Sequence, residues 1–104
     1  MSTHAMRLIA TRQENDIVLV KALIRHANHN GLGRTESGEP ISPHHLVEIV
    51  VTRNDEPVVT IYTGSGIAAD PLFGWRIVAN SGDRISVSWR DSLAMNGRAE
   101  TVLA

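Results

Sequence analysis

Apolar and polar residues alternate along much of this chain with the two-residue period of a β-strand. Ile85, Val87 and Trp89 alternate with serine and arginine, which predicts a strand with one buried and one solvated face. Residues 72–79 alternate in the same way, and the Asn-Ser-Gly-Asp segment at 80–83 is typical of a tight turn. We therefore predict that these two strands form a β-hairpin.

Residues 47–52 and 57–62 also alternate, on either side of an Arg-Asn-Asp-Glu turn, and predict another hairpin. Residues 98–103 supply a final strand, and residues 8–11 supply a short one near the N-terminus. Six or seven strands separated by turns are typical of a sandwich. The sequence thus predicts an all-β fold, an immunoglobulin-like antiparallel β-sandwich of about seven strands.

The segment 17–25 is apolar on both sides. One side of it carries Val18, Val20, Ala22 and Ile24, and the other carries Ile17, Leu19 and Leu23 beside Lys21. A strand that is apolar on both faces has to be covered on both faces. The second cover is either a partner protein or a segment of this chain, such as its N-terminus or a long loop, and periodicity does not choose between them.

Composition narrows the class of protein. The 104 residues, 42% of them hydrophobic, predict one domain over residues 1–104, with a flexible N-terminal segment over residues 1–15. The absence of cysteine excludes a disulfide, a thiolate metal site and a nucleophilic cysteine. Ten Lys and Arg against eleven Asp and Glu leave no field that would attract nucleic acid or an anionic membrane. We find neither a membrane-spanning run nor a stretch typical of a signal peptide.

Four histidines, His26, His29, His44 and His45, flank a long connection over residues 26–43. Imidazoles bind zinc, copper and iron, so a metal site is one interpretation. Surface histidines more often form local hydrogen bonds, and no known ligand spacing is present here. We therefore expect no metal and no other cofactor.

The other polar candidates have simple structural explanations. The serines show no arrangement that specifies a catalytic triad, so serine-hydrolase chemistry is not expected. Five aspartates lie at strand ends or turns, where short carboxylates usually accept hydrogen bonds from the backbone: Asp16, Asp55, Asp70, Asp83 and Asp91.

Several short motifs together resemble one family. They are the strand ending at His26, the glycine Gly31, the segment 38–41 with His44 and Glu48 after it, the Asp70-Pro71-Leu72-Phe73 step, and the segment 82–91. In this order they resemble SoxZ, the Z subunit of the sulfur-oxidation carrier complex SoxYZ, over residues 17–103. The loops differ: of the usual His-Pro-Met-Glu-Thr-Gly, only His26 and Gly31 match.

The resemblance implies a non-catalytic subunit with an immunoglobulin-like fold. Its partner would be a SoxY-like protein, whose C-terminal arm carries sulfur intermediates on a cysteine during thiosulfate oxidation, with transient contacts to Sox enzymes. It also implies a periplasmic location, reached by export together with the partner. The alternatives are a cysteine-free interaction module, a carrier subunit in another oxidative pathway, or a histidine-ligated metalloprotein.

Two surfaces are our candidates for partner binding. One is the second apolar face of the segment 17–25, and the other is the long connection with its flanking residues, which would border the path of the cysteine arm or dock a client enzyme. The candidate residues are Ile17, Leu19, Leu23, His26, Gly31, His44, Asp70 and Pro71.

Overall fold

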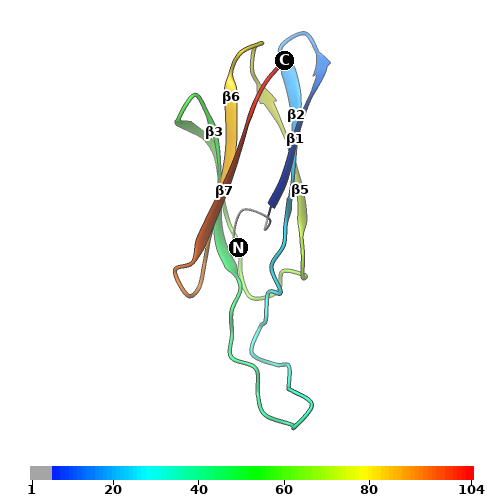
Figure 1. The fold of residues 1–104 in the computed structure, drawn as a ribbon, viewed down its shortest axis with the longest axis vertical. Helices are drawn as coiled ribbons and strands as arrows, with labels where there is room; N and C mark the ends of the chain where they lie inside the picture. Colours follow the sequence, from blue (N-terminus) through cyan, green and yellow to red (C-terminus); the bar gives the residue numbers. More distant parts are fainter. Residues whose placement is uncertain (1–5) are drawn as a thin grey trace.

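A computed structural model describes residues 6–104 as seven strands in two antiparallel sheets, arranged as a sandwich (Figure 1). The strands are β1 (Met6–Glu14), β2 (Ile17–Ile24), β3 (Leu46–Arg53), β4 (Glu56–Tyr62), β5 (Leu72–Val78), β6 (Arg84–Asp91) and β7 (Asn96–Val102). One sheet has the order β1-β2-β5 and the other has the order β4-β3-β6-β7. The predicted all-β sandwich is confirmed.

The hairpin of β3 and β4 is confirmed, with Val51 opposite Val59. The predicted final strand corresponds to β7. At the N-terminus, β1 is nine residues long rather than four, since its polar second half continues to pair with β2. The first five positions of the expected N-terminal segment lie outside the described residues.

The predicted pairing of β5 with β6 is wrong. The turn at 80–83 does form, with the Asp83 amide donating to the Asn80 carbonyl at 3.0 Å. However, β5 pairs with β2, while β6 pairs with β3 and β7. The apolar sides of both strands enter the same core from opposite sheets, as the burial of Ile77 and Ile85 shows. The turn therefore carries the chain from one sheet to the other.

The core lies between the sheets and is mostly aliphatic. The inward side of β2 is fully buried, and it meets buried residues of the other sheet such as Ile49 and Val87. Burial of apolar surface is the main favourable term in folding, and here the inward positions of the strands supply it. This explains why the two-residue alternation predicted the strands well.

The long connection between β2 and β3 leaves one end of the sandwich as a narrow projection (Figure 1). We call residues 29–44 the arm. Its two legs are bridged at His29 and His44 and again at Arg34 and Pro40. The Ile41 amide also donates to the Gly33 carbonyl at 2.9 Å. The arm is thus an irregular hairpin, held by backbone hydrogen bonds between its legs.

Candidate functional site

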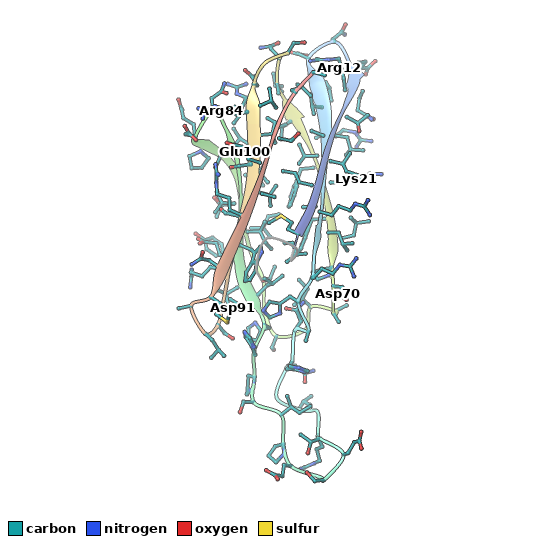
Figure 2. The ribbon with its side chains drawn as sticks, in the orientation of Figure 1. Arg12, Lys21, Asp70, Arg84, Asp91 and Glu100 are labelled. Carbon is teal, nitrogen blue, oxygen red and sulfur yellow. The ribbon has the colours of Figure 1, made fainter. Side chains whose placement is uncertain are left out.

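The candidate residues fall into two groups in space. Ile17, Leu19 and Leu23 lie on the outer face of the β1-β2-β5 sheet, since their neighbours along β2 face the core. The remaining five lie in the arm or around its base: His26, Gly31, His44, Asp70 and Pro71. The labels of Asp70 and Asp91 in Figure 2 mark that end of the sandwich. The first group lies on an uncovered sheet face, whereas most of the second group makes hydrogen bonds within the chain, as described below.

The outer face of the β1-β2-β5 sheet has no cover among residues 6–104. The strand β1 lies beside β2 within the sheet, and the arm extends away from the end of the sandwich (Figure 1). The described part of the N-terminus, residues 6–14, and the arm therefore both leave this face uncovered. Leu72 is 66% exposed on this face, and Ile9 and Val78 are about half exposed.

At the base of the arm, the carboxylate of Asp91 is the centre of a hydrogen-bond cluster. Its Oδ2 lies 3.0 Å from His26 Nε2 and 2.7 Å from His44 Nε2. Its Oδ1 accepts hydrogen bonds from the backbone amides of Leu93 and Met95. Each carboxylate oxygen thus has two partners, which satisfies a group that is only 1% exposed.

The hydrogen bonds assign protons to both histidines. The Asn28 amide donates to His26 Nδ1 at 3.1 Å, so this nitrogen holds a lone pair and Nε2 carries the proton. An ionised carboxylate only accepts hydrogen bonds, so His44 Nε2 also donates to Asp91. The rings of His26 and Trp89 pack in a T-shaped contact, with ring centroids 5.6 Å apart. These contacts join the end of β2 and the start of β3 to the end of β6.

These contacts also set the charge of Asp91. Burial raises the pKa of this carboxyl, but the hydrogen bonds from His26, His44 and the Met95 and Leu93 amides outweigh burial. Together they lower the pKa from its ordinary value of 3.8 to about 2. Asp91 therefore carries its negative charge at neutral pH, facing two imidazole N–H groups.

The three side chains His26, His44 and Asp91 have the composition of a metal site, with donor atoms within 4.8 Å of one another. A metal ion requires the lone pair of each ligating imidazole nitrogen. The proton of His26 would then have to move to Nδ1, which faces the Asn28 N–H. In metal sites the second imidazole nitrogen usually donates a hydrogen bond instead. The arrangement fits a structural clamp better than a metal site.

Asn28 is a residue of this cluster that the sequence reasoning missed. It is buried and adopts a positive φ of 53°, a conformation that asparagine tolerates better than most residues. Its side chain donates to the Ala68 carbonyl at 2.8 Å and accepts from the Leu46 amide at 2.9 Å. It therefore ties the start of the arm to β3 and to the β4–β5 connection.

Asp70 and Pro71 fix the end of β2 to the start of β5. The Asp70 carboxylate accepts from the His26 amide at 2.9 Å, and the Asp70 amide donates to the His26 carbonyl at 2.8 Å. The Pro71 carbonyl accepts from the Ile24 amide. These hydrogen bonds give Asp70 and Pro71 a structural role within the chain.

Gly31 allows the two legs of the arm to approach each other. Its φ is +87°, and a Cβ there would lie 2.9 Å from Cγ of Pro43. Only glycine meets both conditions without strain.

The aspartates were predicted to cap turns. Asp83 does so, since its carboxylate accepts a hydrogen bond from the Asn80 amide. The role predicted for Asp91 was incomplete because it omitted the contacts with the two histidines.

The described part of the chain has no cleft or cavity that would hold a small molecule. Within it we also find no helix with the length and apolarity needed to cross a membrane. The candidate site is therefore a surface, made of an uncovered sheet face and a projecting arm.

Two comparisons with known proteins were informative about the whole chain rather than about this surface. No curated protein matches the chain. The family model described as "Sulphur oxidation protein SoxZ" matches residues 6–102, which is nearly the whole chain and includes all seven strands. The chain therefore belongs to the SoxZ family and is a Sox subunit of sulfur oxidation.

Proposed function

We propose that this chain is the non-catalytic subunit of a sulfur-carrier complex. It binds a SoxY-like protein and supports that protein while its C-terminal cysteine carries sulfur intermediates of thiosulfate oxidation. The observation that carries the proposal is the SoxZ family match over residues 6–102. The same membership supports a periplasmic location, where such carriers work together with their partner.

The chemistry of the chain supports a role without catalysis. It has no cysteine, so it neither carries sulfur on a thiol nor exchanges disulfides with the partner's cysteine. The side chains of His26, His44 and Asp91 are already engaged in hydrogen bonds within the chain. A rigid sandwich with an uncovered face suits a support that positions a mobile cysteine for several enzymes.

In this proposal the arm of this chain has a separate role. It borders the path of the partner's C-terminal segment that carries the cysteine, or it docks a client enzyme. Residues 32–40 are exposed, and Leu32 at 84% has the largest exposure among the large apolar residues of the described part of the chain. The base of the arm is clamped by His26, His44 and Asn28, so it projects in a defined direction. Exposed loops held by a rigid scaffold commonly carry binding functions.

The complex is tested by co-expressing the chain with a SoxY-family protein of the same genome that ends in a cysteine-bearing arm. We expect the two to co-purify in equal amounts. Mass spectrometry should detect sulfur adducts on the partner's cysteine after thiosulfate and the Sox enzymes are added. Failure to form a complex at micromolar concentrations would refute the proposal, while adducts of another sulfur species would indicate another pathway.

The arm is tested by replacing residues 34–40 with an Asn-Gly turn between the paired Gly33 and Ile41. This variant keeps the clamp at the base. We expect it to bind the partner and to slow thiosulfate oxidation in the reconstituted system. An unchanged rate would show that the arm takes no part.

A further inference from the structure

We infer that the outer face of the β1-β2-β5 sheet is the docking surface for the sulfur-carrying partner, and that the partner presents there an apolar surface bearing a line of carboxylates. This inference rests on the proposed function and deepens it. It follows from the pattern of apolar and charged residues on this face and from the contrast with the outer face of the other sheet.

Strand register defines four rows of residues across this face. From the arm end to the far end they are Arg7-Leu23-Leu72, Ile9-Lys21-Gly74, Thr11-Leu19-Arg76 and Glu14-Ile17-Val78, each read from β1 through β2 to β5. Every row contains at least one apolar residue. The apolar positions therefore form a nearly continuous surface, and such exposed surfaces commonly mark interaction sites.

The cations Arg7, Lys21 and Arg76 occupy successive rows on successive strands, and so form a diagonal across the face. Diagonal neighbours in a sheet lie about 7–8 Å apart. Alternate residues of a β-strand are about 7 Å apart along the strand. A partner strand with acidic residues at alternate positions therefore has the right spacing to match this line.

These three cations have no ion-pair partner among residues 6–104. Lys21, at the centre of the face, points away from the sandwich (Figure 2). The one acidic residue that the register assigns to this face is Glu14, at its far end. The face thus has an excess of positive charge in a chain whose net charge is −1.

The outer face of the β4-β3-β6-β7 sheet is different because its charges compensate one another. Arg90 lies 3.6 Å from Glu48, and Arg98 lies 3.2 Å from Glu100. Between these pairs the face carries serine and threonine, including the hydrogen-bonded Thr52 and Ser86. Tyr62 and Val102 are also exposed on this face, so the two faces differ in their charges, and the unpaired cations of the β1-β2-β5 sheet are the informative difference.

The charge pattern also selects a different protein over a second copy of this chain. In a symmetric pair whose two-fold axis passes through the centre of the face, Lys21 would meet the same residue of the second copy. Like charges that are buried opposite each other are unfavourable. A partner with carboxylates at these positions would instead gain complementary contacts and faster association.

The experiment measures the affinity of the intact chain for the SoxY-family partner at low and high salt. We expect Lys21→Glu to lower affinity at low salt by about 30-fold and to reduce the salt dependence of binding. Leu72→Ser should lower affinity by about 10-fold at either salt concentration. The matched controls on the other sheet are Thr60→Glu and Tyr62→Ser, which should stay within about twofold of the original chain.

The outcomes separate this inference from the proposed function. If the original chain binds no SoxY-family protein, the proposed function fails and the inference fails with it. If the original chain binds but Lys21→Glu and Leu72→Ser bind equally well, the docking face is wrong and the proposed function stands. Light scattering of the chain alone should show a monomer, and a dimer that Leu72→Ser dissociates would overturn the choice of partner. Melting curves confirm that each variant is folded.

Discussion

The two regions that the sequence singled out have opposite surfaces. At the base of the arm, Asp91 has four hydrogen-bond donors around one carboxylate, and His26 is nearly buried between Asp91 and Trp89. On the outer face of the β1-β2-β5 sheet, Leu72 and Lys21 are exposed and Lys21 has no ion-pair partner in the described part of the chain. A group that is satisfied within its own chain serves the fold, whereas an unsatisfied one is free to meet a partner.

This difference predicts that changes in the two regions separate stability from binding. Substitutions in the hydrogen-bonded cluster should lower the free energy of unfolding and leave partner affinity intact below the melting temperature. Substitutions on the outer face of the β1-β2-β5 sheet should do the reverse, because the affected side chains, Leu19, Lys21 and Leu72, lie outside the core. The following experiments test that separation.

The largest effect is expected for Leu19→Asp, at the centre of the apolar face. A carboxylate buried at an interface without a partner costs several kcal/mol, so affinity for the SoxY-family partner should fall by about 100-fold or more. Val50→Asp is the matched control, since Val50 holds an equally central and half-buried position on the outer face of the other sheet. Equal affinities for the two variants in calorimetric titration would contradict the separation.

A change at Asp91 should act on stability. Asp91→Asn keeps the shape but places an amide N–H₂ among donors, so we expect a loss of about 2 kcal/mol in the free energy of unfolding. For a chain of this size the melting temperature should fall by about 10 °C. Partner affinity measured at 10 °C should not change.

The control for Asp91 is Asp55→Asn, which removes an exposed ion pair with Arg84. Such surface pairs contribute about 1 kcal/mol or less, so its melting temperature should move little. If Asp91→Asn were no worse than Asp55→Asn, the cluster would not be a structural clamp. If it abolished binding while leaving the melting temperature unchanged, the assignment of the two regions would be reversed.

A smaller loss of stability is expected for Gly31→Ala. Both its φ of +87° and its contact with Pro43 oppose a Cβ, which together should cost about 1–2 kcal/mol. Gly38→Ala is the control, because Gly38 has the same φ but no atom within 4 Å of the added Cβ. The difference between the two melting temperatures measures the close approach of the two legs. Equal values would show that only the backbone conformation matters.

Local sequence patterns predicted those parts of the fold whose contacts join residues close in sequence. The β3–β4 hairpin has both strands and its turn within one short segment, and the inward side of β2 repeats every second residue. The pairing of β5 was missed because the turn after Val78 is compatible with a hairpin and with a crossing between sheets. Which of these occurs depends on β2 and β3, far away in sequence.

The two candidate regions differ in the same way. The apolar face was predicted from Ile17, Leu19 and Leu23 because these residues lie within one strand. The cluster was not predicted, since Asp91 lies 65 residues from His26 and 47 from His44. An aspartate at the end of a strand has a sufficient local explanation as a cap, and Asp91 does cap the turn to β7. Only the folded structure shows its second oxygen between two histidines.

The smallest effect is a dependence of stability on pH that the apolar face should not share. The pKa of Asp91 is about 2 in the folded chain and 3.8 ordinarily, so its ionised form stabilises the fold above pH 4. This contribution is lost as the pH falls from about 4 to about 2, because the unfolded chain takes up the proton first. Asp83 also has a lowered pKa, so the original chain has to be compared with Asp91→Asn. The difference in melting temperature between the original chain and Asp91→Asn should narrow by a few degrees over this range. The difference in melting temperature between the original chain and Leu72→Ser should stay constant. If the difference in melting temperature between the original chain and Asp91→Asn were independent of pH, the carboxylate charge would not contribute to the clamp.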